Sequence, residues 1–445
     1  MLWQGTVVAV YSISTQRAVQ VDETQFRWHL DFPVQGQNID GFHLNSEGLL
    51  LQGWFLDESD SPISLVVLSG CEVIPLTLSR PRSDVISKIL GDSPEDHPKL
   101  HCGFSQQVKL KHSSFCIGVV KEGRFIQILT GAIEGKFQIL KGENGWLFLD
   151  NDTNKSIEQH TGKFRLSRTA KAEWKEYLES LTNYSLSKKL PVCLLVAPSK
   201  EMEYQQYYPY KFSKQAPIRK LTELIPDTLN FVLPIQELRN LDRRSFRVCD
   251  THWSVHGARL ASQLVSSKLS LKAVSELDIF NSDVYQRKRL SGDLGSKLFP
   301  AQLHNEDRLI SFSYREKVIY DNNIDNFGRV ICMLNREALL GESLLVFGSS
   351  SSYTMFDYLS RLYTNIVFVH TAGNIDHDVI EAVRPDCLCL QTNARFVVKA
   401  PKFKGSVFEY IKAKKKSGVL KSPTIAETLP EHSVSYIKFF NEMLR

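Results

Sequence analysis

The sequence predicts an α/β protein in which a mainly parallel sheet follows an all-β segment. Short apolar runs separated by turn residues fill residues 1–135, and from residue 136 apolar strands alternate with amphipathic helices. At 445 residues the chain exceeds the size at which one hydrophobic core usually stops growing. We therefore expect a β-sandwich-like domain at 1–135, an α/β domain at 136–401 and a C-terminal appendage at 402–445.

Residues 1–135 carry strand signals at the intervals that are typical of a sandwich. The runs that predict strands are Gly48–Leu56, Ile63–Leu68, Glu72–Leu78 and Phe115–Val120. The segments 53–57, 80–85 and 102–104 are similar to small β-sandwich modules that are joined to bacterial glycan-processing enzymes. This similarity implies that the first domain is associated with carbohydrate.

The α/β pattern after residue 136 predicts strands buried on both faces and helices that cover them. The expected helices are Ser167–Leu181, Ser254–Leu269, Tyr353–Tyr363 and Asp376–Val383. The expected strands are Val192–Ala197, Leu344–Phe347, Ile366–Val369 and Cys387–Leu390. Residues 402–445 fall outside this alternation, because Pro401 and Pro423 interrupt the chain and only Ser435–Leu444 has a helical pattern.

Composition and charge exclude several classes of protein. The net charge of +5 comes from basic residues dispersed among acidic ones, so we expect no nucleic-acid partner. No apolar run is long enough to span a bilayer.

The cysteines and the N-terminus bear on the location of the protein. The eight cysteines form no C-x-x-C pair, and Met1–Val21 lacks a basic leader and a cleavage site. We therefore expect no signal peptide and a cytoplasmic location.

A run of hydroxyl residues follows the buried strand Leu344–Phe347. Gly348 is followed by serine at every position from 349 to 352, and a helix begins directly afterwards. Open α/β sheets bind ligands at the carboxyl ends of their strands, and the helix N-terminus stabilises a developing oxyanion. We take Ser350 as the candidate nucleophile. Taken alone, four serines also fit a polar loop that caps a helix.

Asp250 and His252 are the candidate base system for this serine. A serine hydroxyl is a weak nucleophile near neutral pH and needs a base that a third group orients. Residues two apart in extended chain point to the same side, so both side chains face one crevice. His256 lies four residues further on. A metal site formed by Asp250, His252 and His256 is therefore an alternative interpretation, but no second cluster of ligand residues accompanies them. We expect no metal and no cofactor.

Ordered landmarks along residues 136–400 resemble the AlgX/AlgJ group of alginate O-acetyltransferases. The motifs that carry the resemblance are KGENGWLFL at 141–149, PSK at 198–200 with Tyr204 and Pro209, DTHWS at 250–254, GDL at 292–294, GSS at 348–350 and RPD at 384–386. The resemblance implies an SGNH-like three-layer fold in which the Asp-x-His pair precedes the serine. It also implies that Asp250 orients His252, that His252 is the general base and that Ser350 forms an acyl-enzyme.

The same resemblance implies a role for the Ser350 backbone amide in the oxyanion hole and a periplasmic location, which differs from the expectation drawn from the N-terminus. The serine motif is also looser here than in that group. We add Trp253 as a candidate for stacking on a sugar ring and Arg395 as a candidate for contacting sugar or carboxylate groups.

The leading hypothesis is an O-acyltransferase, transferring acetyl groups to a polysaccharide or glycan precursor. The expected partners are that carbohydrate acceptor and an acyl donor such as acetyl-CoA or an acylated partner protein, with peripheral contact to a membrane assembly as a further expectation. Two alternatives stay open. One is a carbohydrate acetylesterase with the same residues, and the other is a non-catalytic glycan-binding or assembly protein.

Overall fold

The computed structural model describes residues 10–18, 26–58, 63–136, 139–270, 278–416, 418 and 420–444, which form two compact units. Unit 1 comprises Met1–Gln138 and Ser291–Leu303, and unit 2 comprises Ile139–Leu290 and His304–Arg445. We predicted a domain boundary near residue 135 from the sequence. No pattern in the sequence indicates that Ser291–Leu303 belongs to the first unit. Most of Met1–Val21, on which the expectation about a signal peptide rests, lies outside the described residues.

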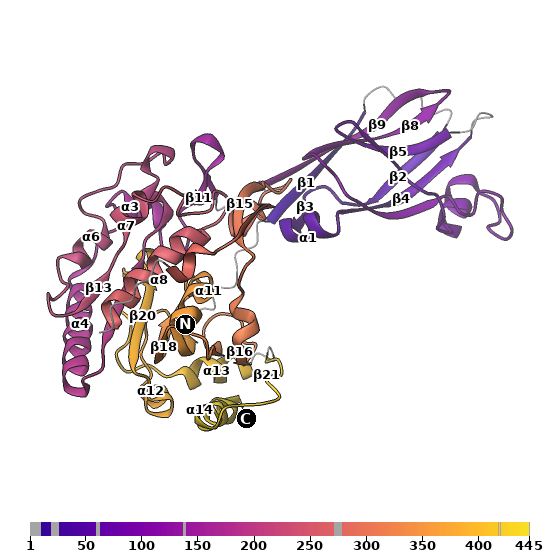
Figure 1. Cartoon of the computed structure of the whole chain (residues 1–445). Helices are drawn as coiled ribbons and strands as arrows, with labels where there is room; N and C mark the ends of the chain where they lie inside the picture. The colour runs from indigo at the N-terminus through magenta and orange to yellow at the C-terminus, as the bar shows by residue number, and fades with distance from the viewer. Residues whose placement is uncertain are drawn as a thin grey trace. The chain divides into compact units, whose positions relative to one another are not determined.

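Unit 1 contains two antiparallel sheets (Figure 1). The larger sheet has the order β3-β1-β9-β8-β5-β6, and the smaller has the order β2-β4-β7. The strands are β1 Val10–Arg17, β2 Phe26–Phe32, β3 Gln37–Asp40, β4 Leu49–Asp57, β5 Ile63–Ser69, β6 Glu72–Pro75, β7 Gly103–Val108, β8 Ser114–Lys121 and β9 Arg124–Lys136. The short helices α1 Gly41–Ser46, α2 Ser83–Val85 and α10 Gly292–Gly295 complete the unit.

One hydrophobic core joins the two sheets of unit 1. Tyr11 on β1, Phe55 on β4 and Val67 on β5 are among its buried members. Along β1 and the first part of β4, alternate residues are buried, as the pleat of a strand requires. The Tyr11 hydroxyl also donates to the carbonyl oxygen of Lys297 at 2.6 Å, so the segment Ser291–Leu303 is hydrogen-bonded to the same unit.

Unit 2 is built on an eight-stranded sheet with the order β13-β12-β20-β18-β19-β17-β16-β21. The strands from β13 to β19 in that order run parallel, and the remaining pairs are antiparallel. Their bounds are β12 Val192–Ala197, β13 Asn230–Val232, β16 Val318–Asp321, β17 Val330–Leu334, β18 Leu340–Gly348, β19 Tyr363–His370, β20 Cys387–Asn393 and β21 Thr424–Ile425. Two hairpins lie outside this sheet: β10 Ile139–Lys141 with β11 Leu147–Leu149, and β14 Tyr285–Leu290 with β15 His304–Leu309.

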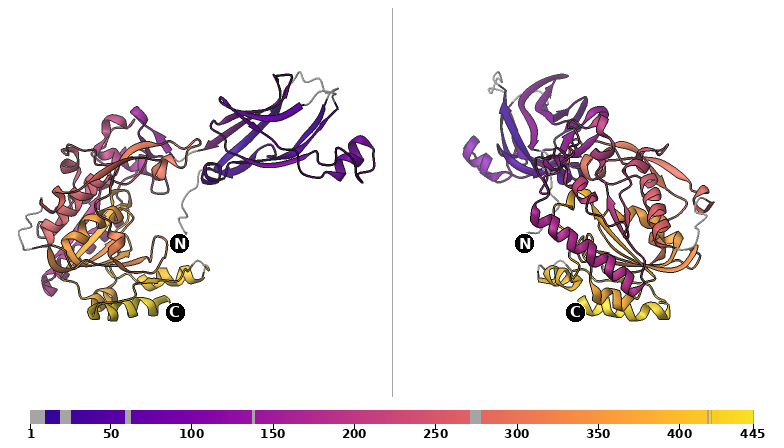
Figure 2. Two further views of the ribbon diagram at one scale, coloured as in Figure 1. Left: turned by 45° about the vertical axis from the view of Figure 1, so that its right-hand side comes forward. Right: turned by 90° about the vertical axis from the view of Figure 1, so that its left-hand side faces the viewer.

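Helices cover both faces of the unit 2 sheet. Helix α4 packs on one face with α12, α13 and α14, and the right-hand view of Figure 2 shows α4 in magenta running across the sheet. Helix α8 contacts β12, β13 and β20, and α11 contacts α8 and β19. The helices are α3 Ser156–His160, α4 Arg168–Lys188, α5 Lys200–Glu203, α6 Pro217–Thr222, α7 Ile235–Arg239, α8 Val255–Leu269, α9 Asp278–Asn281, α11 Ser352–Leu362, α12 His377–Val383, α13 Val407–Lys416 and α14 Glu431–Leu444.

The local reasons for these elements are visible in the sequence. Ser167 caps α4 by accepting the Ala170 amide, and Ser254 caps α8 by accepting the amides of His256 and Gly257. Strand β12 is buried along its whole length, as expected for a continuous apolar run inside a parallel sheet. The helices and strands expected in this region are present. Helix α4 runs to Lys188, well beyond the expected end at Leu181, and the other ends agree more closely.

The expectation that residues 402–445 form an appendage is wrong. Strand β21 pairs with β16 at the edge of the main sheet, and α14 buries Tyr436, Ile437 and Phe440 in the core of unit 2. Helix α13 adds Val407 and Ile411 to the same core. The segment therefore completes one face of the α/β unit, because its apolar side chains cover strand residues that solvent would otherwise reach.

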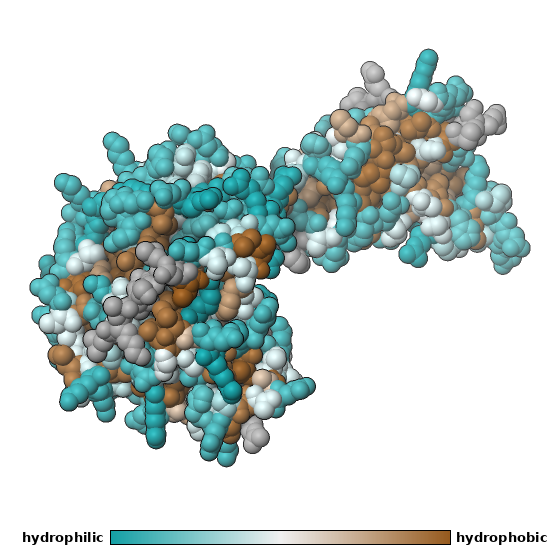
Figure 3. All heavy atoms as spheres, in the orientation of Figure 1, coloured by the Kyte–Doolittle hydropathy of each residue, from teal (hydrophilic) through white to brown (hydrophobic). Residues whose placement is uncertain are grey.

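The surface of the molecule mixes polar and apolar side chains. Figure 3 shows hydrophilic side chains over much of the visible face, interrupted by hydrophobic areas. Exposed apolar residues of unit 1 include Val10, Val34 and Val73. Within the described part of the chain, no helix combines the length and the apolarity that crossing a bilayer requires.

Candidate active site

Ser350 lies on the turn between β18 and α11, where Gly348 ends the strand. A Cβ atom at position 348 would lie 2.4 Å from Ser352 Oγ and 2.9 Å from the ring of Phe368. No larger residue fits there without a shift of its neighbours, so glycine lets the chain turn tightly against the sheet. The turn leaves Ser350 partly exposed at the carboxyl end of the sheet.

The three other serines of this run are buried and bind side chains of β20. Ser349 donates from its backbone amide and its hydroxyl to Gln391 Oε1, at 2.6 and 2.9 Å. The Ser352 hydroxyl donates to the same oxygen at 2.9 Å, and the Ser351 hydroxyl donates to Asn393 Oδ1 at 2.8 Å. Burial and these hydrogen bonds distinguish the three from Ser350, whose hydroxyl faces His252.

The structure brings Ser350, His252 and Asp250 together. His252 Nε2 lies 2.9 Å from Ser350 Oγ, and His252 Nδ1 lies 2.7 Å from Asp250 Oδ1. Asp250 Oδ1 also accepts the backbone amide of His252 at 2.9 Å, which fixes the two side chains relative to each other. A carboxylate at Nδ1 selects the tautomer whose Nε2 accepts the serine proton.

Asp250 is buried, and its carboxylate is held in the charged form. Burial by itself would raise the pKa of Asp250, but the hydrogen bond and charge of His252 lower it more. The guanidinium of Arg247, whose Nη1 lies 3.4 Å from Asp250 Oδ2, lowers it further. The pKa therefore lies below its usual value, and the carboxylate remains available to orient the imidazole at neutral pH.

Backbone groups beside Ser350 are suited to an oxyanion. Helix α11 begins two residues after Ser350, so the positive end of its dipole lies at the turn. Within the described residues, the Ser350 amide donates no hydrogen bond to another protein atom. A free amide at a helix N-terminus is the arrangement that stabilises negative charge developing on a carbonyl oxygen.

Lys200 holds the backbone that carries Asp250. This lysine is 3% exposed, and its ammonium donates to the carbonyl oxygens of Arg247, Val248 and Asp250 at 3.1, 3.0 and 2.7 Å. Burying an ammonium is costly unless it is fully hydrogen-bonded, and here three acceptors from one loop meet that requirement. The side chain of Lys200 therefore has a structural role in the site.

The interpretation of Trp253 as a stacking platform for sugar is wrong. Its side chain is 1% exposed, so neither face of the indole is open to a ligand. The indole Nε1 instead donates to the carbonyl oxygen of Ser351 at 2.9 Å. Trp253 therefore links the loop of His252 to the loop of Ser350 and positions the two relative to each other.

Arg395 lies in the short turn that follows β20. Its guanidinium carbon is 5.0 Å from the ring centroid of Phe396, and its carbonyl oxygen accepts Gln159 Nε2 at 2.9 Å. The side chain also lines a small hollow with Glu201 and His160. A sugar or carboxylate contact by Arg395 remains a prediction.

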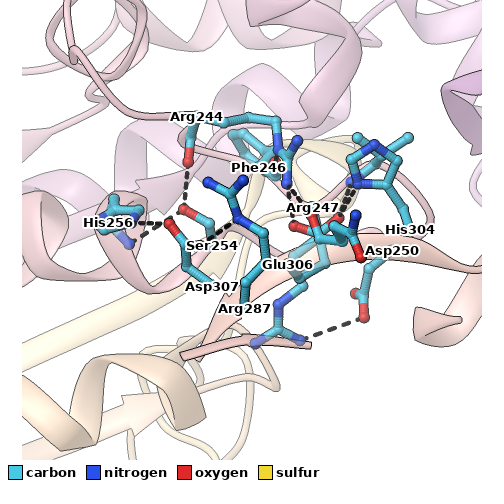
Figure 4. Close-up of polar contacts among 12 residues, drawn as sticks. Arg244, Phe246, Arg247, Asp250, Ser254, His256, Arg287, His304, Glu306 and Asp307 are labelled. Carbon is cyan, nitrogen blue, oxygen red and sulfur yellow. Dashed lines mark hydrogen bonds and ion pairs between the residues drawn. The ribbon is translucent and has the colours of Figure 1, made fainter. Parts of the chain in front are cut away.

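His256 does not join Asp250 and His252, contrary to the alternative that grouped the three as metal ligands. Its Nε2 lies 2.9 Å from Asp307 Oδ2 on β15, and Figure 4 shows this pair apart from Asp250. The side-chain hydrogen bond with His256 lowers the pKa of Asp307. The residues between the two histidines begin α8 through the Ser254 cap, which turns His256 towards β15.

A second ionic contact ties the Asp250 loop to β15 (Figure 4). Glu306 is 3% exposed, accepts Arg244 Nη2 at 2.5 Å and accepts the backbone amide of Val248 at 2.9 Å. Ser254 Oγ donates to the carbonyl oxygen of Arg244 at 2.6 Å. The loop between Arg244 and Ser254 is therefore fixed by hydrogen bonds with Lys200 and with Glu306 of β15.

Comparison with solved structures finds several proteins that are similar to this chain. Bacillus cereus PatB1 matches with 12% identity and a TM-score of 0.44, over 60% of this chain and 99% of its own. The O-acetyltransferase domain of Pseudomonas putida AlgJ matches with 14% identity and a TM-score of 0.38, over 63% of this chain and 100% of its own. Pseudomonas aeruginosa AlgX matches with 13% identity and a TM-score of 0.34, over 59% of this chain and 63% of its own.

The resemblance to the AlgX/AlgJ group is confirmed. AlgJ and AlgX, the proteins that give this group its name, are both among the similar solved structures. No protein-family model matches the sequence, and a comparison with curated proteins gives no match.

Gln391 and Glu306 are site residues that the sequence analysis missed. Gln391 is 0% exposed and follows four apolar residues on β20, so a buried polar residue at the carboxyl end of an apolar strand was the available signal. Glu306 alternates with exposed residues on β15 and shows no such signal. Asn393, two residues after Gln391 on β20, accepts the Ser351 hydroxyl at its Oδ1.

Proposed function

We propose that this chain is an SGNH-type O-acyltransferase that transfers acyl groups, acetyl in the first instance, to a hydroxyl of a glycan. The observation that carries the proposal is the hydrogen-bonded series Asp250, His252 and Ser350, with contacts of 2.7 and 2.9 Å. Nucleophile, base and orienting acid lie within hydrogen-bond reach of one another, and the hydroxyl is partly exposed. The order of the three along the chain agrees with the motif resemblance.

Acylation begins at Ser350. Oγ attacks the acyl carbonyl carbon of the donor while His252 Nε2 takes the hydroxyl proton. The Ser350 amide donates a hydrogen bond to the oxyanion that forms. Collapse of the tetrahedral intermediate breaks the bond to the leaving group, which takes the proton from Nε2. Asp250 remains ionised and stabilises the imidazolium that forms between the two proton transfers.

Transfer to the acceptor reverses these roles. A sugar hydroxyl gives its proton to His252 Nε2 and attacks the acyl-serine carbonyl, and the Ser350 oxygen leaves with the proton that Nε2 returns. The product is a sugar ester and free enzyme. If water attacks the acyl-serine in place of the sugar, the product is the free acid and the activity is that of an esterase. Exclusion of water by the bound acceptor therefore decides between the two activities.

A fluorophosphonate probe tests the enzymatic proposal directly. The wild-type chain should be labelled at Ser350, and Ser350→Ala should abolish labelling. Absence of wild-type labelling contradicts the proposal and favours a non-catalytic glycan-binding protein, whereas labelling that survives Ser350→Ala contradicts the assignment of Ser350 as the nucleophile.

The second measurement separates transferase from esterase. The protein is incubated with p-nitrophenyl acetate, with and without oligosaccharide, and esters on the sugar are detected by mass spectrometry. Ester on the sugar supports transfer, whereas release of acetate alone supports the esterase.

A further inference from the structure

A second cleft lies in unit 2 beside the loop that leads to Asp250. Its volume is about 730 Å³, which is within the range of ordinary ligand pockets. Three aromatic side chains form part of its lining: Trp146, Tyr204 and Tyr207. Another part is formed by the charged residues Arg239, Arg243 and Glu203. Val248, two residues before Asp250, also lines the cleft, so cleft and triad share one loop.

Three aromatic rings of this cleft are stacked. The ring centroid of Trp146 lies 4.2 Å from that of Tyr204 and 5.1 Å from that of Tyr207, with interplanar angles of 30° and 11°. Trp146 is buried, whereas Tyr207 is partly exposed. A partly exposed ring that is fixed from behind by a buried one offers a rigid flat face to a ligand.

Polar groups without protein partners accompany the rings. Glu203 is 4% exposed, its Oε1 accepts the Ser245 hydroxyl, and its Oε2 has no hydrogen-bond partner among the described residues. Within the same residues, the guanidinium of Arg243 makes no ion pair or side-chain hydrogen bond. Glu203 Oε2 is shielded from solvent, whereas Arg243 is exposed, so the guanidinium of Arg243 is the charged group that a ligand in the cleft can reach.

A series of contacts connects this cleft with the triad. Lys200 Nζ lies 5.5 Å from the ring centroid of Trp146 and donates to the carbonyl oxygen of Asp250 at 2.7 Å. A ligand on the Tyr207 face would therefore sit one stacked ring and one lysine away from the backbone of the catalytic carboxylate. This proximity fits a subsite for a substrate that the triad modifies.

We propose that this cleft binds a hexopyranose unit of the acceptor glycan, with Tyr207 stacking on the sugar ring and Arg243 donating to its polar substituents. The proposal rests on the proposed function and names where the acceptor lies. Aromatic faces match the apolar face of a pyranose ring, and guanidinium groups donate to its hydroxyl oxygens.

Binding is measured by calorimetry with the full-length Ser350→Ala protein and three probes: cellohexaose, chitohexaose and a hexamer of polygalacturonic acid. At least one hexamer should bind at millimolar concentration or below. Tyr207→Ala in that background should weaken binding about tenfold or more, the size expected for a lost stacking contact, whereas Tyr207→Phe keeps the ring and should retain the affinity.

The matched control is Tyr210→Ala, which removes an exposed tyrosine three positions along that does not line the cleft. Thermal unfolding of each variant shows whether it is folded at the temperature of the titration. Equal loss in Tyr207→Ala and Tyr210→Ala, or no binding of any hexamer, overturns the subsite.

The two proposals fail separately, because this binding requires no acylation. Wild-type protein that is labelled by fluorophosphonate but binds no hexamer contradicts the subsite alone. Protein that binds a hexamer through Tyr207 but is never labelled contradicts the enzymatic proposal alone.

Discussion

The ammonium of Lys200 lies 2.7 Å from the carbonyl oxygen of Asp250, although the two residues are fifty positions apart in the chain. The same ammonium reaches the carbonyl oxygens of Arg247 and Val248, so a single side chain fixes the backbone on which the orienting carboxylate stands. The position of the orienting carboxylate therefore depends on a buried cation that is not itself a member of the triad.

Lys200→Met should lower both stability and rate. Carbonyl oxygens left buried without a donor should reduce the free energy of unfolding by about 2 to 4 kcal/mol. The loosened Asp250 loop should slow fluorophosphonate labelling of the folded protein about 10- to 100-fold, because small misplacements of catalytic groups are costly. Labelling is timed at a temperature where circular dichroism shows the variant to be folded.

Lys214→Met is the control for this prediction, since Lys214 is exposed and lies outside the site. It should leave stability and labelling close to wild type. A Lys200→Met protein that is folded and labelled at the wild-type rate would show that the loop keeps its geometry without the ammonium.

Ser350→Ala and His252→Ala should each reduce esterase activity by about 10³- to 10⁶-fold with little change in stability. The double variant should lose no more than the more impaired single variant, because the two groups act in the same step. Asp250→Asn should cost as much or less. Rates are measured with p-nitrophenyl acetate.

Ser351→Ala separates the candidate serines. It removes the hydroxyl that bonds Asn393 but leaves the hydroxyl at 2.9 Å from His252 Nε2. Labelling should therefore persist. Multiplicative losses in the Ser350 and His252 double variant would mean that the two groups do not share one mechanism. Labelling that disappears in Ser351→Ala would contradict Ser350 as the nucleophile.

Trp253→Phe tests the corrected role of this tryptophan. Phenylalanine retains most of the buried ring but cannot donate to the Ser351 carbonyl oxygen, so the two catalytic loops lose one connection. We expect kcat to fall about tenfold, the equivalent of one hydrogen bond, while KM for the sugar acceptor is unchanged. A raised acceptor KM with unchanged kcat would instead indicate that the ring contacts the sugar.

The sequence predicted the triad because its chemistry is local. Asp250 and His252 occupy alternate positions of one short segment, and Ser350 follows a strand, a glycine and precedes a helix, so each motif is readable within a few residues. Ser350 lies at the carboxyl end of β18, but Asp250 and His252 lie in a loop of turns and bends before α8 that follows no strand of the main sheet. Their meeting with Ser350, 98 positions after His252, depends on how α8 packs against α11, which the strand pattern does not predict.

Burial and long-range pairing were not readable in the same way. Tryptophan is a residue type that stacks on sugar rings, which made Trp253 a candidate. Whether its faces are covered depends on the Ser351 loop, almost a hundred positions away. Strand β21 has only two residues, Thr424–Ile425, too few for a periodic signal. The inclusion of residues 402–445 in the unit 2 core thus depends on tertiary contacts that no local pattern records.

Glu203 should make stability depend on pH. Burial raises its pKa to about 7, while the Ser245 hydrogen bond lowers it less. An unfolded glutamate ionises near pH 4.3, so between roughly pH 4.5 and 7 the native state keeps a proton that the unfolded state releases. Stability from this group is therefore present at low pH and is lost as pH rises through that window, by about 3 kcal/mol in total.

Glu203→Gln removes this dependence, since glutamine does not ionise and keeps an oxygen for Ser245. Relative to wild type, the variant should become more stable as pH increases from 5 to 8, measured by urea unfolding at several pH values. Glu237→Gln, at an exposed position, should show no such trend. A difference between Glu203→Gln and wild type that stays constant with pH would mean that the carboxyl is ionised in the native state throughout, and that the hydrogen bond from Ser245 outweighs the cost of burial.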